Sequence, residues 1–279
     1  MELKLILAIF AAAVISVAPL PAQSPGVPIE KTGRSSQASI LKAAKLLREG
    51  GKLALDIETA KQQLASPVPG PLVLPEPNTM PLSGRDIAAH AREGYLQFGW
   101  YYLCPHCDNW HVTLAGAYAI AEDAVATCHH CVAPKDDMRE GYLIAVDHDG
   151  EVLPVVAVLA KSATMDAAIV RVAGKLKPLP LNDNIAPGDA AFCYSEPLGQ
   201  QGYFSDGIVN RFYWRGQPGK PGATDEWKTL RVNVSTDWAP GSSGAAVLDH
   251  CGNVIGHVST ISPLSEGPKP APAADDKEG

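Results

Sequence analysis

Apolar residues recur every three to four positions between residues 35 and 65, which is the spacing of one face of a helix. The positions that follow this spacing are Ile40, Leu41, Ala44, Leu47, Leu53, Ile57, Ala60 and Leu64. Gly50-Gly51 interrupts the series, and glycine pairs commonly end helices. The pattern therefore predicts two short helices in this segment.

A proline-rich segment follows these helices, with six prolines between residues 67 and 81. Proline lacks a backbone N–H donor, so this density excludes regular structure and favours a stiff linker. Ser83 followed by Asp86 is typical of a helix start, because the serine hydroxyl can cap the first turn. We expect a third helix that ends near Glu93.

Beyond Tyr95 the pattern changes to short apolar runs that Gly, Pro, Asn or Asp separates. The runs are His111–Ile120, Tyr142–Asp147, Val152–Leu159, Ala167–Val172, Ala190–Tyr194, Gly207–Arg211, Thr229–Val234, Ala245–Leu248 and Val254–Ser259. Many short strands without intervening helices favour an antiparallel sandwich or barrels over a parallel sheet. Residues 264–279 are rich in proline and charge, and we expect a disordered tail there.

The first residues have the character of an export signal. Lys4 precedes an apolar stretch over residues 5–18, and Ala22 stands at a position suited to signal peptidase. We expect residues 1–22 to be a removed signal peptide, which makes the mature protein secreted or periplasmic and leaves it without membrane contact. The alternative is an uncleaved anchor, although the apolar run is shorter than the roughly 20 residues that a spanning helix needs.

Composition narrows the choice of fold and partner. The 279 residues include 25 Gly and 24 Pro, which indicates many turns, and 46% of them are hydrophobic, which is enough for a substantial core. The net charge is −7, and no block of Lys or Arg occurs. Nucleic acid and anionic membrane surfaces are therefore excluded as expected partners.

The cysteines allow two interpretations. They are Cys104, Cys107, Cys128, Cys131, Cys193 and Cys251. In an oxidising compartment we expect them to form disulfides. The alternative is a structural zinc ion held by the two Cys-x-x-Cys pairs, since four thiolates on two tight turns can close a tetrahedral site. His111 is a further possible ligand, although a histidine beside Trp110 is more often a packed strand residue.

Three separated segments carry candidate chemistry. Gly241–Val247 is a turn of small residues running into an apolar strand, where a serine hydroxyl can stand beside N–H groups that converge on an oxyanion. A nucleophilic serine also needs a base and a group that orients the base. Thr127–Val132 supplies histidines after a strand, and Asp166 supplies a carboxylate directly before another strand.

In this order of His, Asp and Ser the sequence resembles the trypsin-like serine peptidases. Thr127–Val132 is similar to their Thr-Ala-Ala-His-Cys-Val, Asp166–Val170 to Asp-Ile-Ala-Leu-Leu, and Gly241–Val247 to Gly-Asp-Ser-Gly-Gly-Pro-Val. Gly207–Val209 and Gly252–Gly256 resemble strands of bacterial HtrA-type members. The resemblance implies a mainly β fold with two antiparallel six-stranded barrels over residues 95–263, after a helical appendage and linker over residues 23–94. We expect no peptide-binding module of the HtrA type after these barrels.

The resemblance also implies the roles of individual residues. Ser243 would be the nucleophile, His130 the general base and acid, and Asp166 the group that orients the imidazole. The N–H groups of Gly241 and Ser243 would form the oxyanion hole. His129 is a rival base, but adjacent residues on an extended segment point to opposite sides, and the motif selects His130.

Further residues gain implied roles or depart from the family pattern. Cys193 and Cys251 look like a pair that a disulfide joins in the family's second barrel, or they are two buried free thiols. Asp237, six residues before Ser243, stands where trypsin has the carboxylate that selects Lys or Arg, or it is a solvated loop residue. Ser259 resembles the segment that pairs with substrate. Ser242 replaces the aspartate used in proteolytic activation, so we expect the oxyanion turn to form without cleavage.

These observations indicate an exported serine endopeptidase that hydrolyses protein or peptide substrates through an acyl-enzyme and needs no cofactor. The alternative is a degenerate peptidase fold that serves as a binding or scaffold module, with zinc as a possible structural ion. That alternative is suggested by Ala245-Ala246, which replace Gly-Pro of the family motif, and by the cysteines around His130.

Overall fold

The computed structural model describes residues 34–215 and 229–260 of the chain. The predicted signal peptide and C-terminal tail lie outside the described residues. The helices are α1 (Arg34–Glu49), α2 (Ile57–Ala65), α3 (Gly84–Gly94) and α4 (His129–Val132), with a short 3-10 turn at Pro197–Gly199. The strands are β1 (Tyr95–Leu103), β2 (Trp110–Ala121), β3 (Ala124–Thr127), β4 (Glu140–Val146), β5 (Val152–Ser162), β6 (Ala167–Val172), β7 (Ala190–Ser195), β8 (Tyr203–Arg215), β9 (Thr229–Val234), β10 (Ala246–Leu248) and β11 (Val254–His257).

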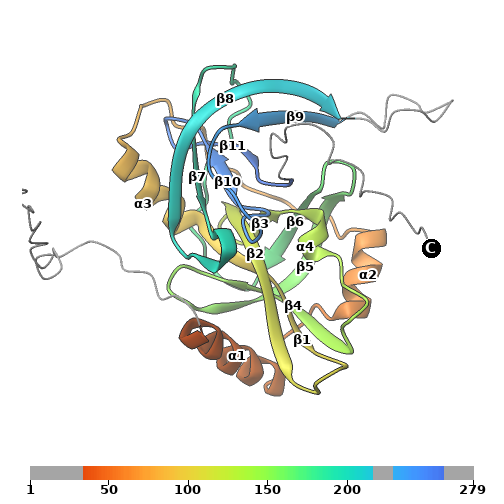
Figure 1. The fold of residues 1–279 in the computed structure, drawn as a ribbon. Coiled ribbons are helices and arrows are strands. Elements are labelled where there is room, and N and C mark those ends of the chain that lie inside the picture. The colour runs from red at the N-terminus through yellow and green to blue at the C-terminus, as the bar shows by residue number, and fades with distance from the viewer. Residues whose placement is uncertain (1–33, 216–228, 261–279) are drawn as a thin grey trace, which may run out of the picture. The chain divides into compact units, whose positions relative to one another are not determined.

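Six strands close a barrel, in the order β1-β2-β3-β6-β5-β4, and each neighbouring pair is antiparallel. The other five strands form a half-barrel in the order β11-β10-β7-β8-β9, over which the long β8 curves (Figure 1). The predicted mainly β class is confirmed. β1 and β3 are strands that the list of apolar runs above did not include.

The second sheet has five strands among the described residues, whereas the resemblance implied six. The place beside β11 is taken by the segment at Leu181, which forms one parallel bridge to Val254. Pro178 and Pro180 stand on either side of Leu179 just before this bridge. Because proline has no N–H to donate, pairing there cannot extend into a full strand.

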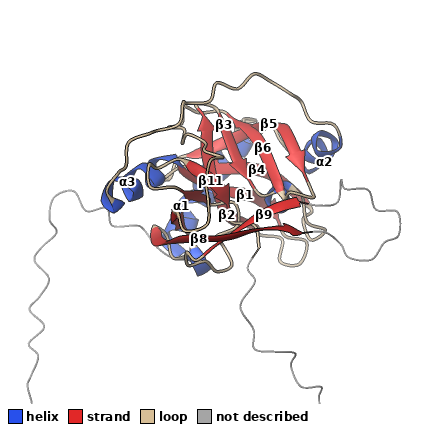
Figure 2. Cartoon of the chain, turned by 90° about the horizontal axis from the view of Figure 1, so that it is seen from above, coloured by secondary structure: helices blue, strands red, loops and turns tan. Residues whose placement is uncertain are grey.

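The two predicted N-terminal helices form, and both pack on the barrel. They are separated at Gly51, whose φ of +66° suits glycine, and α2 begins with Asp56 accepting a hydrogen bond from the Thr59 N–H. Ile40 of α1 is buried in a hydrophobic cluster with Tyr101 of β1. Figure 2 shows α2 beside β5 of the barrel.

The proline-rich segment contains no helix or strand, as predicted, but it is bonded to both sheets. The Val68 N–H donates to the carbonyl of Val158 in β5. Further along, the Asn78 N–H donates to the side chain of Asn253, which precedes β11. The segment therefore runs along the surface as a strap. The described residues contain no helix that is both long and apolar enough to cross a bilayer.

The core cluster that matters for the site lies between the barrel and the second sheet. It joins Tyr118 and Ala126 of the barrel to Val247 and Leu248 of β10. The third helix forms as predicted, with Ser83 capping it, and it contributes Ala91 to the same cluster. This shared core sets the ends of β3, β6, β10 and β11 against one another.

Candidate active site

His130 and Asp166 come together because of strand pairing. β3 pairs with β6, with Thr127 opposite Ala168. His130 lies three residues after Thr127, and Asp166 lies two residues before Ala168. The His130 Nδ1 atom is 2.9 Å from Oδ2 and 3.1 Å from Oδ1 of Asp166, and the His130 N–H donates to Oδ1 at 3.1 Å.

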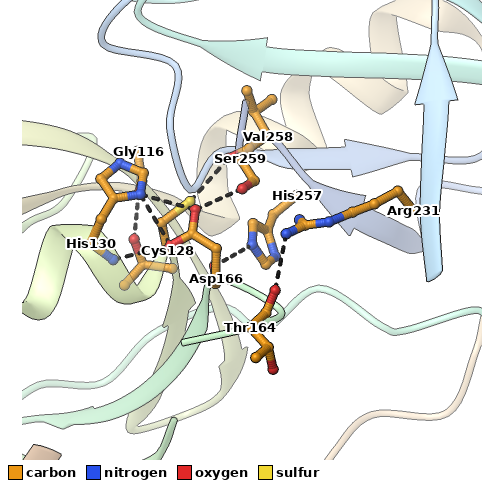
Figure 3. Close-up of polar contacts among 10 residues, drawn as sticks. Gly116, Cys128, His130, Thr164, Asp166, Arg231, His257, Val258 and Ser259 are labelled. Atoms are coloured by element: carbon orange, nitrogen blue, oxygen red, sulfur yellow. Dashed lines mark hydrogen bonds and ion pairs between the residues drawn. The ribbon is translucent and has the colours of Figure 1, made fainter. Parts of the chain in front are cut away.

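The Asp166 carboxylate is held from the second sheet as well. Ser259 donates its hydroxyl to Oδ2 at 2.6 Å, and the Asp166 carbonyl lies 3.0 Å from the His257 Nε2 atom. Figure 3 shows the carboxylate between the His130 ring and the Ser259 hydroxyl. The backbone of Asp166 has φ 53°, in the left-handed region that aspartate tolerates better than most residues.

This geometry favours the charged forms of both partners. The hydrogen bond to Asp166, with a further contribution from Cys131, raises the pKa of His130 to about 10, although burial acts in the opposite direction. Burial alone would raise the pKa of Asp166, but the hydrogen bonds from His130 and Ser259 lower this pKa below its ordinary value. Burial lowers the pKa of His257, so a neutral ring is favoured there.

The turn that carries Ser243 is held against the barrel by backbone contacts. The Gly116 N–H of β2 donates to the Ser243 carbonyl at 2.7 Å, and Thr127 donates its hydroxyl to the Gly116 carbonyl at 2.8 Å. The Val258 carbonyl accepts both the Gly244 N–H, at 2.7 Å, and the Cys128 thiol, at 3.1 Å. The serine turn is thereby tied to the segment that leads to His130.

Ser243, the expected nucleophile, and His130, the expected base, are not hydrogen-bonded to each other in the described residues. In the described part of the chain, no hydrogen bond joins the Ser243 hydroxyl to the His130 ring. Catalytic hydrogen bonds are often long without substrate and tighten when it binds.

Two N–H groups in the turn are left available. Within the described ranges, neither Gly241 nor Ser243 donates its N–H to a backbone carbonyl, whereas Ser242, Gly244 and Ala245 do. Gly241 has φ +106°, and a Cβ there would lie 2.6 Å from the Glu196 carbonyl oxygen. Two neighbouring N–H groups of this kind are what an oxyanion hole requires.

Ser242 takes part in holding this turn. Its side chain is buried, and its hydroxyl lies 3.1 Å from the hydroxyl of Ser195, the last residue of β7. Ala245 and Ala246 are not among the described non-glycine residues with positive φ, so their Cβ atoms strain no backbone. Gly116 makes room for Ala245, because a Cβ on Gly116 would come within 2.9 Å of the Ala245 Cβ.

The expectation that His129 and His130 lie on an extended segment was wrong. Residues 129–132 form the helical turn α4 rather than an extended segment. Successive side chains on a helix differ in direction by about 100°. His130 contacts Asp166, whereas His129 is half-buried and its pKa is lowered chiefly by burial.

All six cysteines are free thiols in the structure, so the expected disulfides, including the one between Cys193 and Cys251, are not formed. The four clustered cysteines also do not converge on one tetrahedral site. They divide into two groups of potential ligands, and within each group the ligand atoms lie within 4.8 Å of one another. One group is Cys104, Cys107 and His111, and the other is Cys128, His130 and Cys131.

The second of these groups is already engaged. Its His130 ring is bonded to Asp166, and its Cys128 thiol donates to the Val258 carbonyl. The hydrogen bond between Cys128 and Cys131 raises the pKa of Cys128 and lowers that of Cys131, which keeps the proton on Cys128. These contacts assign the group to the candidate active site.

Two pockets flank the candidate site. One of about 280 Å³ adjoins Gly241, with Ile40 of α1 and Gln97 of β1 in its walls. The other, of about 400 Å³, lies beside Ser259 and is lined by His257 and Trp238 among others. Asp237 lines neither of these pockets. It is exposed and accepts a hydrogen bond from the Tyr203 hydroxyl at 3.2 Å.

Several residues of the site were not anticipated from the sequence. The Cys128 thiol and the Val258 carbonyl tie the two halves together, and α1 supplies a pocket wall. The only available signal was Gly116, because a glycine inside a strand often marks a close backbone approach. Ser259, which was expected near substrate, lines the pocket of about 400 Å³ and also bonds the Asp166 carboxylate.

Comparison with known proteins adds a family assignment to this geometry. The family model described as a trypsin-like peptidase domain matches residues 115–256, which contain His130, Asp166 and Ser243. No curated protein matches the chain.

Proposed function

Because the chain belongs to the trypsin-like peptidase family, we propose that it is a serine endopeptidase with Ser243 as nucleophile, His130 as base and Asp166 as the group that orients the base. The observation that carries this proposal is the pair of contacts between His130 Nδ1 and the Asp166 carboxylate, at 2.9 and 3.1 Å. They leave the Nε2 atom of the ring free of Asp166 for proton transfer.

The proposed reaction divides the work among these groups. Only the neutral form of His130 can act as the base, and the raised pKa of this ring means that the neutral fraction grows as the pH rises. Nε2 of the neutral ring takes the proton of the Ser243 hydroxyl as the oxygen attacks the substrate carbonyl carbon, and the Asp166 carboxylate stabilises the imidazolium that forms. The Gly241 and Ser243 N–H groups donate to the oxyanion of the tetrahedral intermediate. His130 then passes the proton to the leaving amine, which releases the first product. Water activated by the same ring hydrolyses the acyl-enzyme.

The pocket contacts support substrates that extend past the cleaved bond. The pocket beside Gly241 is lined by α1 and by Gln97, whose side-chain amide donates to Glu196 at 2.5 Å. A peptide leaving group would pass along this wall.

We further propose that the protein is exported and acts outside the cytoplasm, as the apolar N-terminal sequence indicates. We also propose that its peptidase domain is of the bacterial HtrA type.

The first test is cleavage of an unfolded protein and of a peptide library, with products identified by mass spectrometry. The wild-type chain should cut both, and Ser243→Ala and His130→Ala should each lose the activity. His129→Ala is the matched control, because His129 is the neighbouring imidazole without a hydrogen bond to Asp166, and it should keep most of the activity. Equal loss in the two histidine variants would contradict the choice of base.

A second candidate function is a non-catalytic binding or scaffold protein with the same fold. It is favoured by one observation, the lack of a hydrogen bond between the Ser243 hydroxyl and the His130 ring within the described residues. A folded wild-type protein that cuts none of the library, yet retains specific peptides from it, would support this alternative.

A further inference from the structure

A group of metal-ligating side chains lies at the tip of the hairpin formed by β1 and β2, and the proposed peptidase reaction does not use it. The group consists of Cys104, Cys107 and His111, whose ligand atoms lie within 4.8 Å of one another. The Cys107 Sγ atom is 3.0 Å from the His111 Nε2 atom. We propose that this hairpin tip is a zinc site in which two thiolates and one imidazole bind the ion and water fills the fourth position.

The backbone of the hairpin brings these residues together. Tyr102 pairs with His111 across the two strands, and their rings are 5.8 Å apart, so both side chains lie on one face. Cys104 is two residues beyond Tyr102 along the extended chain, and alternation places it on that same face. The strand register therefore places the Cys104 thiol and the His111 imidazole on the same face of the hairpin.

A tight turn then brings the second thiol to these two groups. The Asp108 N–H donates to the Cys104 carbonyl at 3.2 Å, and the Cys104 N–H donates to the Asn109 carbonyl at 3.0 Å. Asp108 has φ 54°, which reverses the chain directly after Cys107. Arg139 braces the turn through a 2.6 Å hydrogen bond to the Asp108 carboxylate. The turn is thus built by backbone contacts that do not depend on the thiols.

The donor set selects the kind of metal. Thiolate and imidazole ligands suit zinc, whereas magnesium and calcium prefer oxygen ligands. Zinc bonds of about 2.3 Å to sulfur and about 2.0 Å to nitrogen are compatible with ligand atoms this close together. Cys107 is exposed and Cys104 half-buried, so an ion and its water can reach the site from solvent.

The site would brace a wall of the substrate cleft. Val112 and Leu114 of β2, just beyond His111, line the pocket of about 280 Å³ beside Gly241. Fixing the hairpin tip would restrict the motion of this strand. The inference does not rest on the proposed peptidase function, since metal content can be measured in an inactive protein.

The test is metal analysis of the full chain, purified without added reductant and dialysed without chelator. The wild type should retain about one zinc ion per chain, and replacement by cobalt should give the thiolate charge-transfer absorption of a tetrahedral site. Cys107→Ser and His111→Ala should each weaken zinc binding by at least about tenfold. Both positions lie at the hairpin tip outside the buried core, and a circular dichroism melt checks that each variant folds.

His106→Ala is the matched control, because it removes another imidazole of the same turn that is not in the group, and it should keep the zinc. Equal loss in this control would contradict the assigned ligands. Wild-type protein without zinc, with copper in its place, or with Cys104 and Cys107 joined in a disulfide would overturn the proposal. Zinc retained in both ligand variants would do so as well.

Discussion

The Ser259 hydroxyl donates a 2.6 Å hydrogen bond to the Oδ2 atom of Asp166, across the junction between the second sheet and the barrel. Asp166 belongs to the loop before β6, and Ser259 follows β11. The carboxylate that contacts His130 is therefore held in place by both halves of the molecule.

Ser259→Ala should reduce peptidase activity without unfolding the protein. A hydrogen bond to a charged group contributes about 1.5–3 kcal/mol, so if its loss is felt fully in the transition state kcat/KM should fall by roughly ten- to a hundredfold. The pKa of Asp166 should rise, because one of the groups that lowers it is gone. Ser259→Thr keeps the hydroxyl and should recover much of the activity. Unchanged kinetics in Ser259→Ala would show that this hydrogen bond does not position the carboxylate.

Asp166→Asn should return the pKa of His130 from about 10 toward its ordinary value, because Asp166 is the main cause of the shift. NMR titration of the imidazole measures this directly. A raised pKa in the folded state means that the charged ring stabilises the fold below pH 6.5, the ordinary pKa of histidine, and that this stability is lost as the pH rises toward about 10. The variant should lose this pH dependence of stability.

Asp237→Asn is the control for that titration, because Asp237 bonds Tyr203 and lies in another loop. It should leave the pKa of His130 unchanged. If Asp166→Asn also leaves this pKa unchanged, the two residues do not form the contact on which the proposed function depends.

Gly244→Ala should destabilise the protein more than Gly150→Ala, although both glycines have positive φ, +81° and +87° respectively. A Cβ at Gly244 would overlap the Gly116 carbonyl and the Thr127 hydroxyl, whereas a Cβ at Gly150 meets nothing within 4 Å. Both variants should lose about 1–2 kcal/mol from backbone strain. Gly244→Ala should lose a further 1–3 kcal/mol or so from overpacking. Equal losses in denaturant unfolding would contradict the close approach of the serine turn to β2.

Ile40→Ala tests whether α1 is part of the folded unit. Ile40 is 3% exposed, while Leu46 on the same helix is 62% exposed. Ile40→Ala should lower the free energy of unfolding by about 2–5 kcal/mol, and Leu46→Ala should change it by less than about 0.5 kcal/mol. The Ile40 variant should still unfold in one transition. A separate early transition of the helices would mean that α1 and α2 are an independent appendage.

Much of the fold could be predicted because local patterns decide it. Alternating apolar runs with turn residues between them gave most strands, and the break at Gly50-Gly51 gave the ends of two helices. β3 is only four residues long, and β1 has aromatic residues on both faces, so neither showed a clear alternation. Among the described residues the second sheet stops at five strands beside Pro178 and Pro180, and the effect of these prolines appears only when a partner strand is known.

The candidate site also has a part that could be predicted from the sequence and a part that could not. His130, Asp166 and Ser243 were recognisable because each lies in a short motif, and the strand register then joins the first two. Contacts between residues far apart in sequence could not be predicted. They include the shared bonds at the Val258 carbonyl, the α1 wall of the pocket and the division of the cysteines into two groups. The position of Asp237 also depends on a tertiary contact, its bond to Tyr203.

The measurement that tests the central claim most directly is labelling of the purified protein with a fluorophosphonate probe, followed by peptide mapping. The probe reacts only with a serine that is activated by a base and faces an oxyanion hole, so no natural substrate is needed. We predict labelling at Ser243 that is abolished in Ser243→Ala and preserved in His129→Ala. A folded wild-type protein that takes up no label, or takes it up at another serine, would contradict the assignment of Ser243 as the nucleophile.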